Sequence, residues 1–392
     1  MFRNVTPEKA IEFTWLSVAV MCCLPLPATA TRSQLLRFKI LRFLGALCAC
    51  GLILPLLYAV YMKYDDPVIF TNAAGLAVAV CQVPVHVYLS IIYYDRIQVN
   101  FRYNYLNRDV GIPDVLQAMI EYMTNYCGKA KSSERQVLQR YVDKYATFYG
   151  LCTAWFYVTA AVFDVGALFA AQPFPSNAEY PFAVDYEPLK SLIFLHHVVV
   201  SFQCSGAVCM NAVAALMILF AAARFEILML ELQKYASMNP IAHSGGNFLS
   251  SFAREVVSVM QYTAIATTIL ATLPLVLCGL NIIGASITHL QFAFMAGIAI
   301  LEVFMVAWPA DDLLEAVRCI CILSARNLNY YYTISFYHQS EKAVQSLFES
   351  PWYNNLVKLQ KAVLFSLVPQ KPVFISCFYI IPVLSLRYFC SV

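Results

Sequence analysis

The feature that most constrains this chain is a series of apolar stretches, each about as long as a helix that crosses a lipid bilayer. Such a helix needs about 20 residues. Stretches of that length cover residues 43–62, 68–93, 145–171, 192–223, 262–285 and 289–308. A further stretch, 373–390, is apolar but short, and it contains Pro382 and Arg387. The sequence therefore predicts an all-α polytopic membrane bundle of seven transmembrane helices.

The overall composition supports a membrane protein and excludes several other classes. Apolar residues make up 60% of the 392 residues and charged residues 12%, whereas soluble domains have about 45–50% and about 25%. So few charges cannot cover the surface of a soluble protein of this size, and the chain is far too apolar to be disordered. The net charge of +3 comes without a basic stripe, so we expect a lipid bilayer and no nucleic acid as its surroundings.

The positive charges predict the direction in which the chain enters the membrane. Cytoplasmic loops carry an excess of Lys and Arg. If successive loops alternate sides, all but Lys63, Lys190 and Arg387 of the 26 Lys and Arg residues fall on the side of the N-terminus. The N-terminus is therefore predicted to be cytoplasmic, and seven spans place the C-terminus outside. This orientation is opposite to that of a G-protein-coupled receptor.

Residues 1–42, which precede the first span, permit two interpretations. The apolar run 16–30 ends in an Ala-Thr-Ala sequence, as a secretory signal peptide does. However, Glu8 and Glu12 offset the basic residues in front of it. We favour a cytoplasmic region with a short helix on the membrane surface, anchored by Trp15, and signal-peptide cleavage is the alternative.

The sequence lacks motifs for catalysis and metal binding. It contains no zinc-protease, P-loop, nucleophile-elbow or dinucleotide-binding pattern. The 14 cysteines form no C-x-x-C pair, and nearly all lie in predicted spans or cytoplasmic segments, which argues against a zinc site and a disulfide framework. We therefore expect no enzyme activity, no cofactor and no metal.

Amphipathic patterns predict that some helices continue beyond the membrane. Segments 132–144 and 224–235 combine charged and apolar residues at helical spacing. They should extend the third and fourth spans into the cytoplasm. Residues 43–308 then form the first six spans with their loops, and 309–372 form a cytoplasmic loop and anchor region.

Sparse polar residues in the outer halves of apolar spans predict a pocket for a small lipophilic ligand. Charged residues inside a span are costly and usually functional, so we expect Asp164 in a ligand vestibule and Glu302 near an ion path. Their different depths argue against a direct pair. The predicted ligand-binding residues are Thr71, Tyr157, Phe163, Asp164, His196, Phe202 and Gln291. Core or lipid-facing packing is the alternative for the pocket residues in general. An ordinary polar position near the outer end of the fourth span is the alternative for His196, and an aqueous cavity or a helix cap near an interface is the alternative for Asp164 and Glu302.

Several short segments, taken in their order along the chain, resemble insect odorant receptors. They are EYPF at 179–182, RFE at 224–226, WPADDLL at 308–314, SE at 340–341, SPWY at 350–353 and PQKP at 369–372. Each segment alone is weak. Their order, the chain length and the inverted seven-span topology make the resemblance fairly specific over most of the chain.

The resemblance implies a tuning receptor that assembles with the odorant receptor co-receptor into a heterotetramer. Such an assembly is a ligand-gated, non-selective cation channel in the plasma membrane of a sensory neuron dendrite. Volatile ligands would bind in the outer half of the bundle, and the seventh helices would line the pore. A gustatory receptor-type channel, which would work without the co-receptor, is the alternative. A multispan transporter is a further alternative, although no internal repeat is evident.

Two segments depart from the family pattern. Residues 317–339 separate the WPADDLL segment from the Ser-Glu pair that follows it rather directly in the family. The ending, 373–392, makes a short or degenerate seventh helix. We interpret both segments as read-through of unspliced introns, because a Val-Arg start fits a GT donor and a Gln end fits a CAG acceptor. A genuine lineage-specific loop is the alternative for 317–339.

Overall fold

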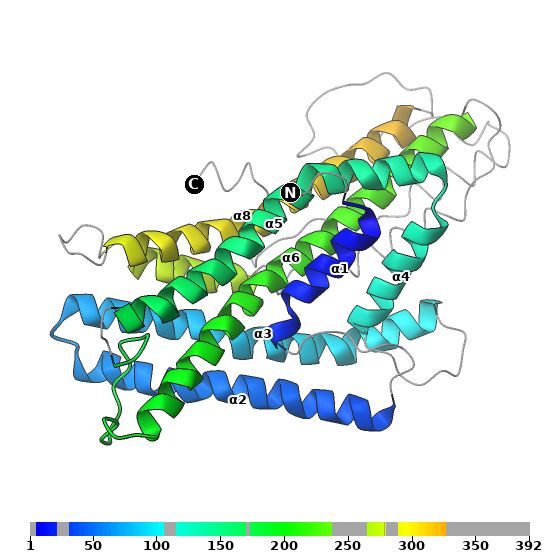
Figure 1. The fold of residues 1–392 in the computed structure, drawn as a ribbon. Coiled ribbons are helices and arrows are strands. Elements are labelled where there is room, and N and C mark those ends of the chain that lie inside the picture. Colours follow the sequence, from blue (N-terminus) through cyan, green and yellow to red (C-terminus); the bar gives the residue numbers. More distant parts are fainter. Residues whose placement is uncertain are drawn as a thin grey trace.

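The computed structural model describes residues 5–21, 31–105, 115–169, 173–236, 265–277, 279 and 289–326. All the regular elements among them are helices (Figure 1). They are α1 (Pro7–Ser17), the short 3₁₀ helix η1 (Ala19–Met21), α2 (Arg32–Met62), α3 (Pro67–Tyr105), α4 (Val115–Lys129), α5 (Ser132–Phe169), α6 (Leu189–Ala236), the helix Ile265–Leu277 and α8 (His289–Arg326). The predicted all-α class is confirmed.

Five of these helices, α2, α3, α5, α6 and α8, are long and apolar enough to cross a membrane. They correspond to the first four predicted spans and the sixth, so the chain is a multi-pass membrane protein. The helix Ile265–Leu277 lies within the predicted fifth span, 262–285. The predicted seventh span, 373–390, lies outside the described residues.

Three helices continue well past the apolar stretches that predicted them. Helix α5 begins at Ser132 and α6 continues to Ala236, which confirms the helical extensions predicted for 132–144 and 224–235. Helix α8 continues to Arg326. The start of the suspected insertion 317–339 therefore lies inside an uninterrupted helix, and residues 327–339 lie outside the described part of the chain.

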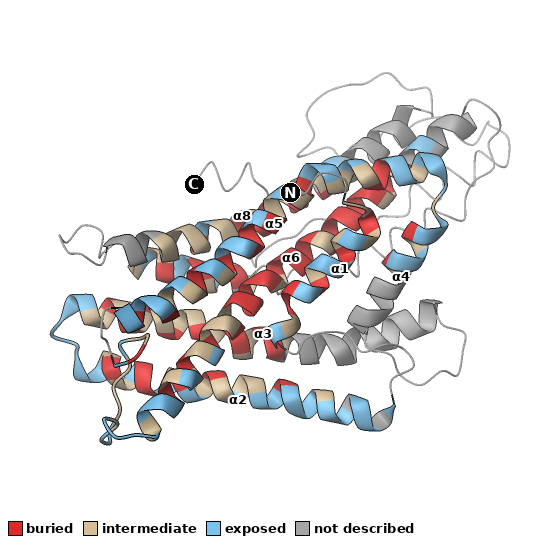
Figure 2. Cartoon of the chain, in the orientation of Figure 1, coloured by how far each residue is buried: buried red, intermediate tan, exposed pale blue. Residues whose placement is uncertain are grey.

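Helix α6 forms the centre of the bundle. It contacts α1, α2, α3, α5 and α8, and 89% of the most apolar window of α6 is buried, against 28% for α2. Figure 2 shows the same contrast, with α6 mostly buried and α2 largely exposed. The exposed leucines of α2, among them Leu47, Leu54 and Leu57, suit a face in contact with lipid rather than water.

Small side chains allow the neighbouring helices to approach α6 closely. Its buried surface includes Ala215, Ala221 and Ala222, none of which exposes any surface. Close approach of backbones through small residues is the usual way in which membrane helices associate. At Gly206 the approach is closest: an added Cβ would lie 2.9 Å from the Cγ of Met21, so a larger residue would require the Met21 side chain to shift.

One face of the N-terminal helix packs against the bundle, and its other face is exposed. Thr6 caps α1 by accepting a hydrogen bond from the amide of Lys9, and Pro7 occupies the first turn. Trp15, which we expected as an anchor at the membrane surface, is 5% exposed and belongs to the main core cluster with residues of α5 and α6. Burial of this large aromatic side chain in the core explains the difference.

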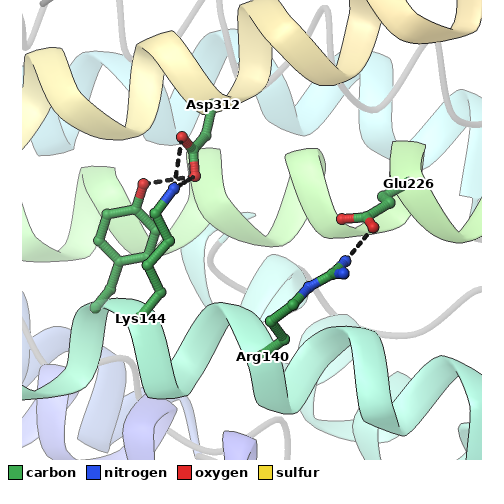
Figure 3. A network of polar contacts seen from close by, with 5 residues as sticks. Arg140, Lys144, Glu226 and Asp312 are labelled. Carbon is green, nitrogen blue, oxygen red and sulfur yellow. Dashed lines mark hydrogen bonds and ion pairs between the residues drawn. The ribbon is translucent and has the colours of Figure 1, made fainter.

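Ion pairs join α5 to α6 and α8 at the predicted cytoplasmic end of the bundle (Figure 3). Arg140 of α5 pairs with Glu226 of α6. Lys144 Nζ lies 2.8 Å from Asp312 Oδ2 of α8, and the buried Tyr145 donates a hydrogen bond of 2.5 Å to the same oxygen. Nearby, Trp308 packs edge-on against Tyr145 at 4.7 Å between ring centroids.

A proline in α8 explains a further contact between α5 and α8. Pro309 lies inside the helix and has no amide hydrogen, so it cannot donate to the carbonyl of Met305 four residues earlier. Tyr149 of α5 donates a hydrogen bond of 2.5 Å to that carbonyl. Met305 is completely buried, where an unpaired carbonyl would be costly. The tyrosine therefore supplies the donor that the proline removes.

Candidate ligand-binding cavity

A cavity of about 160 Å³ lies within the bundle, bounded by α2, α3, α5, α6, α8 and the helix Ile265–Leu277. Its apolar wall includes Leu56, Leu76, Phe156, Phe163 and Met295. An apolar cavity of about 150 Å³ is large enough to bind benzene. This cavity therefore has room for a small organic molecule with a compact apolar body.

Asp164 is a polar residue of the cavity that has one unsatisfied hydrogen-bond acceptor. It lines the cavity from α5, and only 5% of its surface is exposed. Its Oδ2 accepts a hydrogen bond of 2.5 Å from the Ser201 hydroxyl of α6. Its buried Oδ1 has no hydrogen-bond partner among the described residues, so Asp164 brings an unsatisfied acceptor to the wall of the cavity.

A second carboxyl group, Glu302, lines the cavity from α8. It is 2% exposed. The Gln82 amide of α3 donates to both of its oxygens, at 3.1 Å and 3.0 Å. This contact joins α3 to α8 and satisfies both carboxyl oxygens. Because Asp164 lines the same cavity, the two carboxyl groups that we expected in separate places contribute to one site.

The loop 173–188 contributes the end of the cavity next to α6. Pro175 and Ser176 line it together with His197. His197 Nδ1 lies 3.2 Å from the Ser176 hydroxyl, and its Nε2 lies 2.9 Å from the Tyr180 hydroxyl. Burial raises the pKa of Tyr180 to about 12, so this phenol stays neutral at physiological pH. Both histidine nitrogens are occupied, so His197 positions the loop rather than offering a free group.

Further contacts attach the same loop to α2. The Glu179 amide donates to the Pro55 carbonyl at 3.2 Å, and Lys63 Nζ lies 3.6 Å from the Glu179 carboxylate. Phe174 packs against the rings of Tyr180 and His197. The EYPF segment, which carried part of the family resemblance, is thus the segment that holds the loop over the cavity.

Two of the predicted ligand-binding residues, Phe163 and Asp164, line the cavity. Tyr157 and Phe202 pack against each other with ring centroids 6.2 Å apart, and the Tyr157 hydroxyl donates to the Ser17 carbonyl at 2.5 Å. Tyr157 therefore attaches the N-terminal region to α5 and packs on Phe202 of α6, and neither residue is among those that line the cavity.

The other predicted residues lie elsewhere. His196 faces α2, where its Nε2 donates to the Cys48 carbonyl at 2.8 Å. Thr71 is buried near the start of α3 and donates to the Pro67 carbonyl at 2.5 Å. Gln291 belongs to α8, but its side chain lies outside the described part of the structure. A ligand contact by any of the seven residues remains a prediction.

Sequence reasoning missed most of the polar residues of the cavity. On α6 the lining residues are His197, Val200, Ser201, Cys204, Ser205 and Val208. Their spacing of three and four residues describes one stripe on one face of a helix. That periodicity was visible in the sequence and could have selected Ser201 and His197 in preference to their neighbours Phe202 and His196. Gln82 carries no comparable signal.

The described residues include no group of His, Cys, Asp or Glu that could hold a metal ion.

Comparison with solved structures identifies the fold. The chain is similar to the insect olfactory receptor OR5 from Machilis hrabei, with a TM-score of 0.67 over 97% of this chain and 93% of that one. The chain has the fold of an insect olfactory receptor. The sequences are 14% identical, so the likeness concerns the fold alone. No protein-family model matches the chain, and no curated protein matches it.

Proposed function

We propose that this chain is an insect odorant receptor and that it binds small volatile lipophilic molecules in the cavity between its helices. The observation that carries the proposal is the combination of an olfactory-receptor fold with a buried, mainly apolar cavity. Apolar pockets with a few convergent polar groups are typical of small-molecule sites. In the plasma membrane the chain would act as one subunit of a heterotetrameric cation channel with the odorant receptor co-receptor.

The packing of α8 supports a route from ligand binding to channel opening. Glu302 lines the cavity, and Asp312 lies about 15 Å further along the same helix at about 1.5 Å per residue. There Asp312 contacts Lys144 and Tyr145 of α5. A ligand that binds better to one arrangement of α5 and α8 would shift the population toward it. The open state would therefore be the arrangement with the stronger ligand contacts.

Current recording tests this proposal. The full chain is expressed with and without the odorant receptor co-receptor, and a panel of volatile compounds is applied to both. We expect cation currents that require both chains. Currents from this chain alone would favour a gustatory receptor-type channel. Silence of both combinations, with the chain at the cell surface, would contradict the proposed function.

The suspected intron read-through requires a separate measurement. We propose that the spliced message lacks the codons for 317–339 and encodes a different seventh helix from about residue 373. Sequencing of the transcript tests this directly, and the presence of 317–339 in all spliced messages would refute it. If the segment is retained in the expressed chain, its deletion together with restoration of a family-like seventh helix should restore currents that the longer chain lacks.

A further inference from the structure

We infer that the cavity is built for a protonated amine, with Asp164 as the group that binds the ammonium nitrogen. The inference rests on the proposed function for its current recordings, but its binding test does not depend on channel activity. Its structural basis is one cavity that holds two buried carboxyl groups and, among the described residues that line it, no Lys or Arg.

The open acceptor is Oδ1 of Asp164. The carboxyl is held in one orientation because its other oxygen accepts from Ser201 Oγ at 2.5 Å. The Ser201 hydroxyl also lies 3.0 Å from the Val198 carbonyl of its own helix, so its one hydrogen faces two acceptors, of which Asp164 is the nearer. Oδ1 is buried and has no partner among the described residues. A buried acceptor without a donor is costly, and a ligand N–H group would remove that cost.

The balance of charge favours an amine over other hydrogen-bond donors. A buried carboxylate needs an opposite charge or a proton. Among the described residues, the hydrogen-bond partner of Glu302 is the neutral amide of Gln82, and neither carboxyl has a cationic partner among the described lining residues. A neutral amine that enters the cavity can take the proton of a carboxylic acid at Asp164. The products are a carboxylate and an ammonium, and the net charge of the site is unchanged.

An ammonium bound at Asp164 would also benefit from the second carboxyl group. Glu302 lies on α8 and Asp164 on α5, so carboxyl oxygens, which carry partial negative charge even when the group is protonated, line the cavity from two helices. Alcohols and ketones gain less, because they carry no charge for these oxygens to stabilise. The remaining wall is apolar and the volume is about 160 Å³, which suits a single ring or a short branched chain. A compact alicyclic amine offers an N–H donor for Asp164, carries a positive charge once protonated and fits the volume of the cavity.

The binding test compares four compounds of nearly equal shape: cyclohexylamine, cyclohexanol, cyclohexanone and methylcyclohexane. The full-length chain in lipid nanodiscs is titrated with each compound, and thermal stabilisation reports binding. We expect the amine to bind at least about tenfold more tightly than the alcohol, because charge-assisted hydrogen bonds are about twice as strong as neutral ones. Equal or tighter binding of cyclohexanone or methylcyclohexane, or no binding of the amine, would overturn the inference.

Asp164→Asn is the decisive variant. Asparagine keeps the shape and can still accept the hydrogen bond of Ser201, so the contact between α5 and α6 is retained. We expect about a tenfold or greater loss of amine affinity and less than about a threefold change for cyclohexanol. Asp143→Asn is the matched control, since Asp143 belongs to the same helix but is exposed. Equal loss of both ligands in D164N, or the same loss in D143N, would contradict the assignment of Asp164.

Two further readouts separate this inference from the proposed function and from misfolding. Ser201→Ala removes the hydroxyl but keeps the carboxyl group, so it should retain the preference for the amine. Recordings with the co-receptor then show whether the amine opens the channel. Binding of the amine without currents would refute the proposed function and leave the amine site standing. Currents evoked by cyclohexanone but not by cyclohexylamine would support the proposed function and contradict the amine site.

Discussion

Replacement of Tyr149 by Phe tests whether this hydroxyl compensates for the proline in α8. The hydroxyl donates at 2.5 Å to the Met305 carbonyl, which Pro309 leaves without its helical donor. In the wild-type background Tyr149→Phe leaves a carbonyl unpaired at a residue with no exposed surface. The expected loss in the free energy of unfolding is about 1–3 kcal/mol, which is the usual cost of an unsatisfied buried group.

The same substitution should cost much less when Pro309 is replaced by Ala. Alanine restores the amide that donates to the Met305 carbonyl, so the hydroxyl of Tyr149 becomes one of two possible donors. In this background the loss should fall below about 0.5 kcal/mol, which gives a coupling energy between the two positions of about 0.5–3 kcal/mol. Pro309→Ala alone should be neutral or stabilising, since proline in a helix interior disfavours the helix by about 3 kcal/mol.

Equilibrium unfolding of the four purified chains in mixed micelles measures this cycle. The four chains are the wild type, the two single variants and the double variant. Distant, independent substitutions add to within about 0.3–0.5 kcal/mol. Additive effects of Tyr149→Phe and Pro309→Ala would therefore refute the link between the missing amide and the tyrosine. A stabilising effect of Tyr149→Phe in the wild-type background would refute it as well.

Three further predictions concern the core, the cavity and the orientation. Trp15→Ala should lower the free energy of unfolding by about 3–5 kcal/mol, because it truncates a large buried aromatic side chain. A change below about 1 kcal/mol in the same micelle assay would instead support a position of Trp15 at the membrane surface. Phe163→Ala should change the order in which ligands activate the channel, whereas Phe202→Ala should lower surface expression without reordering them. Dose–response curves beside surface labelling separate these outcomes, and the converse pattern would contradict the cavity assignment. A glycosylation sequon introduced into the loop 173–188 should be modified in cells, and one near the N-terminus should not, which a gel-mobility assay shows.

The helices of this fold could be predicted because each carries its own signal in length and hydropathy. The apolar part of helix α6 is 39 residues long, almost twice the length of about 20 residues that a span requires. It can therefore be recognised without knowledge of its neighbours. Its extension to Ala236 could also be predicted, because charged residues alternate there with apolar ones at helical spacing. The burial of Trp15 could not be predicted in this way, because a short helix rich in apolar residues suits a membrane surface and a protein core equally well.

The side chains of the cavity could be predicted only in part, because they depend on how each helix is rotated about its axis. Neighbouring residues on a helix point about 100° apart. The step from Ser201 to Phe202 therefore separates a cavity residue from one that packs on Tyr157, and the step from His196 to His197 separates a contact with α2 from a contact with Tyr180. Asp164 was found because a charge inside a span is informative whatever the rotation.

The two buried carboxyl groups of the cavity oppose folding when charged, but the same charge can contribute to ligand binding. Neither Asp164 nor Glu302 has a cationic partner among the described lining residues, so each burial opposes folding unless a proton or a ligand neutralises the charge. Ser201 donates to Asp164 and Gln82 donates to Glu302, and an amide of equal shape at either position could still accept one hydrogen bond from its donor. The fold therefore needs a hydrogen-bond acceptor at these two positions and gains nothing from the charge itself. A charge that does not help the folded state is best explained by what it binds, and sites where a chain departs from the rules of stable packing are where function is expected.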